Sequence, residues 1–221
     1  KMLDQVLDFF DLQPDYDLDV MRPDQSPFEV TTGVLTRLQP VLQKERPDLV
    51  MVQGDTTSTF AGALAAFYLK IPVAHVEAGL RTYDKHQPFP EEINRHLVSV
   101  LADWHFAPTE RARANLLREG IPPERIFVTG NTVVDALQMI LARPAPPLPD
   151  FVVKLSPEQR LLLVTAHRRE NWGQPLQHIC HALRALIQRF PEVVIAFSVH
   201  LNPNVQSVVR RELQGIPRIH L

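Results

Sequence analysis

The 221-residue sequence contains a single cysteine and only eight glycines. One cysteine excludes an internal disulfide framework and a cysteine-rich zinc module, and it is typical of a protein from the reducing cytoplasm. No apolar run reaches the roughly 18 residues that a membrane-spanning helix needs, and no signal peptide is visible. We therefore expect a soluble, cytoplasmic protein with no membrane partner.

A strong charge of either sign is also missing. Lysine and arginine together number 23, aspartate and glutamate number 25, and the formal net charge is −2. Nucleic-acid-binding domains usually carry a marked positive excess, so this balance argues against a nucleic-acid partner. Hydrophobic residues make up 45% of the sequence and charged residues 22%, the proportions of a globular protein that buries a sizeable core.

Short apolar runs alternate with helical patterns through the first part of the chain. The expected strands cover 49–52, 71–76, 105–107 and 125–129, and the expected helices cover 59–70, 90–101, 109–119 and 133–142. Thr109 is a plausible N-cap, and Gly120 marks the end of the helix that follows it. Continuous apolar strands separated by helices predict an α/β fold with a doubly wound parallel sheet.

One of these helices, beginning near Pro90, has a clear apolar stripe. Its members are Ile93, Leu97, Val100 and Leu101, which recur at the spacing of one helical face. A helix in a globular protein usually turns such a stripe toward the interior. We therefore expect this stripe to face the core.

The alternation stops at the proline-rich segment 144–150, whose four prolines predict a stiff linker. Beyond it, strands are expected at 161–165, 193–199 and 218–221, and helices at 176–190 and 205–214. We predict a Rossmann-like domain over residues 1–143 and the beginning of a second, nucleotide-binding one over 151–221. The first residues already read as a helix and the last as an apolar strand, so we expect a fragment of a longer protein.

Polar residues gather where the expected strands end, which is where α/β sheets bind ligands. Asp55 follows the first strand among hydroxyl side chains that would suit a phosphate, although a simple N-cap is the alternative. His75 and Glu77 share one face at the end of the next strand, where a charged pair is the alternative. Glu91 and Arg95 lie one helical turn apart, and acids in a first turn also compensate the helix dipole.

The second domain has two such clusters. His167, Arg168 and Arg169 follow its first strand, and two guanidinium groups with an imidazole would suit a diphosphate; a basic surface turn is the alternative. His200 precedes an Asn-Pro-Asn sequence that is first of all turn chemistry. The two Asp-x-Asp matches within residues 15–19 are too short to predict a metal site, and we expect no metal.

Seven short motifs follow one another along the chain: Met-Leu-Asp-Gln at 2–5, Gln-Gly-Asp-Thr-Thr at 53–57, His-Val-Glu-Ala-Gly-Leu-Arg at 75–81, Pro-Glu-Glu-Ile-Asn-Arg at 90–95, Thr-Gly-Asn-Thr at 129–132, His-Arg-Arg-Glu-Asn at 167–171 and Val-His-Leu-Asn-Pro-Asn at 199–204. In this order and at this spacing they resemble the non-hydrolysing UDP-N-acetylglucosamine 2-epimerases. The resemblance implies two Rossmann-like domains arranged as in GT-B enzymes. It also implies that an N-terminal strand and most of the C-terminal domain lie outside this chain.

Members of that family interconvert UDP-GlcNAc and UDP-ManNAc in the cytoplasm, in the biosynthesis of cell-surface polysaccharides. They are usually homodimers and use no metal or other cofactor; they eliminate UDP to give 2-acetamidoglucal and then add it back. The catalytic residues that the resemblance implies are Asp55, Glu77, Glu91 and His167. The substrate-binding residues that it implies are Arg95, Arg168, Arg169 and His200.

Three other functions share parts of this pattern. A GT-B glycosyltransferase has the same architecture but also needs an acceptor site. A hydrolysing epimerase would release free ManNAc, and a catalytically silent nucleotide-sugar sensor would need only the phosphate-binding cations. The presence of Asp55, Glu77 and Glu91 together with His167 favours the non-hydrolysing epimerase.

Overall fold

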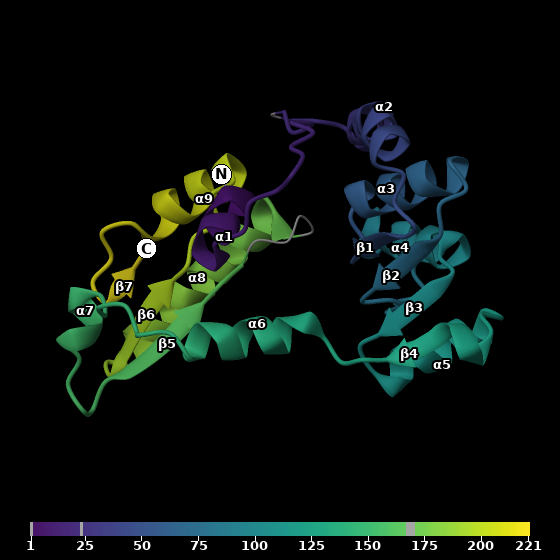
Figure 1. The fold of residues 1–221 in the computed structure, drawn as a ribbon. Coiled ribbons are helices and arrows are strands. Elements are labelled where there is room, and N and C mark those ends of the chain that lie inside the picture. The colour runs from purple at the N-terminus through teal and green to yellow at the C-terminus, as the bar shows by residue number, and fades with distance from the viewer. Residues whose placement is uncertain (1, 23, 167–170) are drawn as a thin grey trace. The chain divides into compact units, whose positions relative to one another are not determined.

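The structure, a computed structural model, describes residues 2–22, 24–166 and 171–221. The chain divides into two compact units, one ending at Arg143 and the other beginning at Pro144 (Figure 1). Each unit is built around a parallel sheet, which confirms the predicted α/β class. Among the described residues, none of the helices has both the length and the apolarity that crossing a bilayer requires.

The helices of the first unit are α1 (Met2–Phe10), α2 (Pro27–Glu45), α3 (Thr57–Tyr68), α4 (Glu91–Leu101), α5 (Glu110–Arg118) and α6 (Thr132–Leu141), with a 3-10 helix η1 (Pro123–Arg125). Its strands are β1 (Val50–Gln53), β2 (Val73–Val76), β3 (Trp104–Ala107) and β4 (Ile126–Val128). They pair in parallel in the order β1-β2-β3-β4, so their carboxyl ends meet at one edge of the sheet. Helices α3 and α4 pack on β2, and α5 packs on β3 and β4.

The second unit contains the helices α7 (Asp150–Val153), α8 (Gln174–Arg189) and α9 (Pro203–Leu213), and the strands β5 (Arg160–Val164), β6 (Val193–Phe197) and β7 (Ile219–His220). The strands are parallel in the order β5-β6-β7. Its core joins α8, α9 and β6 around buried residues such as Leu176, Cys180, Ile195 and Val209. Burial of Cys180 raises the pKa of its thiol, so this cysteine is an apolar core residue.

Local signals explain where several helices begin. Thr109 caps α5, because its side chain accepts the backbone N–H of Ala112 (3.1 Å), as the sequence predicted. Helix α2 was absent from the sequence-based prediction. Its start carries a capping box, in which Ser26 accepts the N–H of Glu29 and the Glu29 carboxylate accepts the N–H of Ser26. This pair of residues was the signal that would have located α2.

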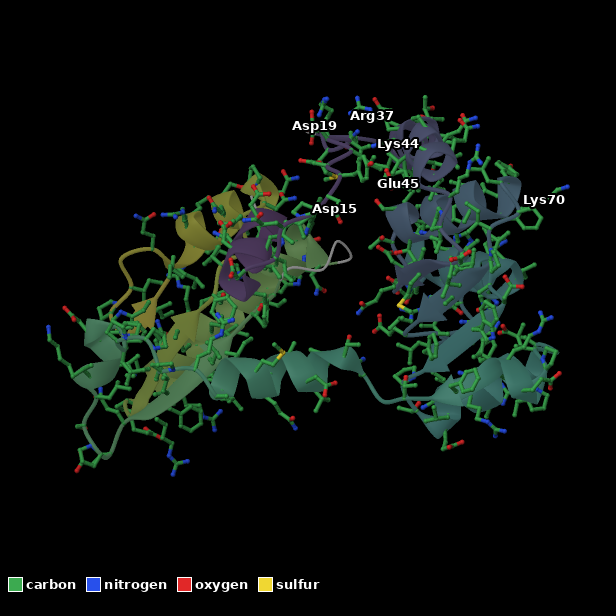
Figure 2. The ribbon with its side chains drawn as sticks, in the orientation of Figure 1. Asp15, Asp19, Arg37, Lys44, Glu45 and Lys70 are labelled. Carbon is green, nitrogen blue, oxygen red and sulfur yellow. The ribbon has the colours of Figure 1, made fainter. Side chains whose placement is uncertain are left out.

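The segment before α2 is tied to that helix by side-chain hydrogen bonds (Figure 2). Arg37 donates to the carbonyl of Asp19 (2.6 Å), and Lys44 donates to the hydroxyl of Tyr16 (2.7 Å), which itself donates to Glu45. Among the described residues, no group of three or more histidine, cysteine, aspartate or glutamate side chains could hold a metal ion. Within this segment the Asp19 carboxylate pairs with Arg22 (3.3 Å), and the Asp17 carboxylate accepts the N–H of Asp19 (2.8 Å).

Helix α4 is turned the opposite way from the prediction. Ile93, Leu97 and Val100, expected in the core, are 41%, 42% and 81% exposed, and only Leu101 packs against the core. The buried face consists of Glu92, Asn94, Arg95, Val98 and Ser99. The prediction was wrong because periodicity shows which residues share a face but not which way that face points. Here the polar face lies inside because its groups have hydrogen-bond partners there.

Candidate functional site

The ends of β1 and β2 turn sharply next to each other. Gly54 and Glu77, which follow these strands, both have positive φ (80° and 67°), and the N–H of Gly54 donates to the carbonyl of Val76 (3.0 Å). A Cβ atom on Gly54 would lie 3.4 Å from the Oε2 atom of Glu77. The Glu77 carboxylate therefore lies within van der Waals reach of the β1 turn, and the left-handed backbone of that turn favours glycine at position 54.

Asp55 follows Gly54, but it is not the N-cap of α3. Thr56 has that role, since its Oγ1 accepts the N–H of Thr59 (3.2 Å), and Oγ1 of Thr59 in turn donates to the carbonyl of Gln53 (2.7 Å). The cluster that follows β1 therefore does cap the helix, but through Thr56 and not through Asp55. Its carboxylate remains available for another partner.

That partner is Arg95. Its Nη2 donates to Oδ2 of Asp55, its Nη1 donates to the backbone carbonyl of Glu77 (2.8 Å), and the neighbouring Asn94 donates to the carbonyl of Asp55 (3.0 Å). Arg95 is buried, and a buried guanidinium needs this set of acceptors. Glu91, half-buried, lies one helical turn before Arg95. Arg95 thus brings Asp55 and the backbone of Glu77 together at one edge of the sheet, and Glu91 lies one helical turn before this arginine.

The side chain of His75 contacts the backbone of the β1 turn. Its ring is fully buried, its Nε2 lies 2.8 Å from the carbonyl of Gly54, and its Nδ1 has no partner among the described residues. Burial lowers its pKa to about 4, so the ring is neutral at pH 7 and Nε2–H donates to the carbonyl. His105, in register with it on β3, is also buried, and burial likewise lowers its pKa to about 4. The surface charged pair considered for His75 is therefore excluded.

Glu92 fixes the loop between β2 and α4. Its carboxylate accepts the N–H groups of Thr82 (3.1 Å) and Tyr83 (2.9 Å), and Nε2 of His96 lies 3.2 Å from it. Burial alone would raise the pKa of Glu92, but these donors bring it below its usual value. Sequence reasoning gave this residue no role, because two adjacent acids in a first helical turn look alike and the resemblance implied a catalytic role for Glu91 alone.

The same loop is packed tightly on α5. The buried Arg81 donates to both carboxylate oxygens of Glu119 (2.8 and 2.7 Å), and Asn115 donates to the carbonyl of Gly79 (2.9 Å). Gly79 has a φ of 84°, and a Cβ atom there would lie 2.3 Å from the carbonyl oxygen of Ala112. Arg81 therefore anchors the loop to α5, and Gly79 permits its close approach.

Of the site residues predicted in the second unit, the structure describes His200. His167, Arg168 and Arg169 lie outside the described residues, so their roles stay predictions. At His200, Nδ1 accepts the N–H of Asn202 (3.1 Å), and Asn202 caps α9. The turn chemistry expected for this sequence is confirmed, and a binding role for His200 stays a prediction.

Comparison with known proteins decides the family. The profile described as UDP-N-acetylglucosamine 2-epimerase matches residues 1–221. The chain belongs to this family. It is 51% identical over 228 residues to the UDP-N-acetylglucosamine 2-epimerase of Yersinia pestis, covering 100% of this chain and 60% of that protein. The chain therefore spans about 60% of the length of such curated relatives.

Solved structures of this epimerase family are similar over the whole chain. The UDP-GlcNAc 2-epimerase of Neisseria meningitidis, bound to UDP-GlcNAc, matches with a TM-score of 0.89 and 44% identity, covering 100% of this chain and 61% of that one. The complex of S. aureus MnaA with UDP matches with a TM-score of 0.92 and 46% identity, covering 100% and 58%. The resemblance and the fold class predicted from the sequence are confirmed.

Proposed function

We propose that the full-length protein containing this chain is a non-hydrolysing UDP-N-acetylglucosamine 2-epimerase. It interconverts UDP-GlcNAc and UDP-ManNAc in the cytoplasm, as a homodimer and without a cofactor. The observation that carries the proposal is the arrangement around Arg95, which grips the Asp55 carboxylate and the backbone of Glu77 while Glu91 lies one turn away. Relatives of this chain carry the epimerase name and have been solved with UDP-GlcNAc or UDP.

The reaction explains why several carboxylates are needed. The C2 hydrogen of the sugar is not next to a carbonyl, so direct deprotonation is not feasible. In the proposed route a base removes the C2 proton, the C–H electron pair forms the C1=C2 bond of 2-acetamidoglucal, and the C1–O bond breaks so that its electron pair leaves with UDP. Re-addition of UDP, with a proton delivered to the other face of C2, gives the epimer.

Each step gives a task to a group at this sheet edge. Positive charge develops on the sugar ring as the C1–O bond breaks, and a carboxylate stabilises it. Proton exchange on two faces of C2 needs acid–base groups from two directions. Asp55 and Glu77 come from strand ends and Glu91 from a helix start, so they approach from different elements. We assign these three residues to the charge and proton steps.

The departing diphosphate needs cations. We assign His167, Arg168, Arg169 and His200 to the nucleotide phosphates on the chemistry of their side chains, because guanidinium groups bind phosphate oxygens bidentately. Arg95, assigned to the substrate from the resemblance, already uses two of its nitrogens on Asp55 and Glu77. Its proposed contribution is to hold these two residues in place for the substrate.

Deuterium exchange tests the proposal. The full-length protein is incubated with UDP-GlcNAc in deuterated water, and NMR should show deuterium at C2 of both UDP-sugars. A glycosyltransferase or a sensor leaves C2 unlabelled, and a hydrolysing epimerase releases free ManNAc, so either result overturns the proposal. The assigned carboxylates are tested with the isosteric variants Asp55→Asn, Glu77→Gln and Glu91→Gln. Each variant should fold normally but incorporate deuterium at C2 at least ~100-fold more slowly.

A further inference from the structure

Two peptide groups flank Asp55, and each of them is held by a buried side chain. The carbonyl of Gly54, which belongs to the peptide before Asp55, lies 2.8 Å from Nε2 of His75. The carbonyl of Asp55, which belongs to the peptide after it, accepts a hydrogen bond from the side-chain amide of Asn94 (3.0 Å). His75 is 0% exposed and Asn94 is 7% exposed, so both donors are shielded from water.

These two bonds limit how the Asp55 side chain can turn. A peptide group is planar, so a residue has only two soft backbone dihedrals, φ and ψ. When the peptide planes on both sides of Asp55 are held, both dihedrals are fixed, and the direction of its Cα–Cβ bond is fixed with them. Only the side-chain dihedrals remain, and the hydrogen bond from Arg95 to Oδ2 of Asp55 restrains these. The carboxylate is thereby held in one orientation.

The sheet brings His75 to the β1 turn. His75 is the third residue of β2, and it pairs in register with Val52 of β1, two residues before Gly54. Its ring is neutral at pH 7, because burial lowers its pKa to about 4. Since a carbonyl can only accept, Nε2 carries the proton of this bond. Asn94 reaches the other carbonyl from α4, so two different elements hold the backbone on either side of the carboxylate.

We propose that His75 and Asn94 are positioning residues of the epimerisation. In this role neither contacts the substrate; both act through Asp55, whose carboxylate has to meet the sugar ring in one orientation. A displacement of about 1 Å in a catalytic group can lower the rate on the order of 100-fold. Loss of either bond should therefore lower kcat and leave KM near its original value, because the proposed phosphate-binding groups belong to the second unit. The inference rests on the proposed function and names the residues that support one of its carboxylates.

A second buried histidine allows a matched comparison. His105 pairs in register with His75 on the next strand and is equally buried, but within the part of the chain that the structure describes it makes no hydrogen bond to the β1 turn. In the full-length protein, His75→Leu should lower kcat by about 10–100-fold, and so should Asn94→Leu. The control His105→Leu should leave kcat near its original value. His75→Gln, whose amide nitrogen can take the place of Nε2 as the donor, should restore most of the rate.

A double-mutant cycle separates positioning from a general loss of structure. The rate of deuterium incorporation at C2 is measured for Asp55→Asn with and without His75→Leu. A residue that acts only through the Asp55 carboxylate loses its effect once that carboxylate is gone. The second substitution should therefore change the residual rate of Asp55→Asn by less than about 2-fold.

Two results would overturn the inference. In the first, His105→Leu slows the exchange as much as His75→Leu does; in the second, His75→Leu slows it by the same factor with and without Asp55→Asn. If circular dichroism shows that His75→Leu does not fold, the same cycle with Asn94→Leu decides. Failure of the proposed function looks different, because the unsubstituted full-length protein would then incorporate no deuterium at C2, whatever the variants do.

Discussion

Replacing Gly79 by alanine tests how closely the loop after β2 must approach α5. Gly79 and Gly120 have the same φ of 84°, but a Cβ atom at Gly79 would lie 2.3 Å from the backbone oxygen of Ala112 and 2.9 Å from Leu116, whereas one at Gly120 would meet nothing within 4 Å. The left-handed conformation alone costs a residue with a Cβ about 1–2 kcal/mol. Overpacking against backbone adds about 1–3 kcal/mol.

We therefore expect Gly79→Ala to lower the free energy of unfolding of the first unit by about 2–5 kcal/mol, and the matched control Gly120→Ala by about 1–2 kcal/mol. The sequence has two tryptophans, Trp104 in β3 and Trp172 beyond the unit boundary. In a Trp172→Phe background, fluorescence during urea unfolding reports on the first unit alone. Equal losses for the two glycine variants would show that the contact with α5 is not tight and would refute the reasoning.

Three more predictions concern titration and positioning. Burial lowers the pKa of His75 and of His105 from 6.5 to about 4. Between these two values of pH, both histidines are protonated in the unfolded chain but neutral in the folded chain. The free energy of unfolding should therefore fall between pH 7 and 5, by about 2 kcal/mol per histidine, and an unchanged urea midpoint would contradict this. Arg95→Lys should keep the fold, measured by circular dichroism, but lower kcat by on the order of 100-fold, because one ammonium cannot replace the guanidinium fork; near-normal turnover would remove its positioning role. Glu92→Gln, which keeps the shape but weakens the bonds to the loop amides, should cost about 1–2 kcal/mol in urea unfolding, and a neutral result would show that these bonds do not hold the loop.

Much of the fold could be predicted because its strands are uninterrupted apolar runs. The end of α5 before Gly120 and its start at Thr109 were also correct, since a cap and a terminating glycine act locally. The direction of α4 was wrong, because Ile93 and Val100 form a regular stripe whether it faces the core or a partner. The direction is revealed by the partners of the inner polar face, which include the loop amides at Glu92 and the acceptors at Arg95.

The candidate site was predictable in part, because the positions of the strand ends could be read from the sequence. That Asp55 and Glu77 would meet followed from the rule that parallel strands end at one edge of a sheet. The partners that hold the site together did not follow. Arg95 is 40 residues from Asp55 in the sequence, and Arg81 is 38 residues from Glu119, so nothing local pairs them. Such contacts depend on how the helices stack.

The strand order of the first unit bears on how the protein is made. In the order β1-β2-β3-β4, every strand pairs with the strand that precedes or follows it in the chain. Each crossover between these four strands joins strands that are neighbours in the sequence, so their mutual pairing needs no distant segment. As the chain leaves the ribosome, the sheet can grow one strand at a time. The residues that meet at Arg95 are all present once α4 has emerged, so the carboxylate edge can form before the second unit is synthesised.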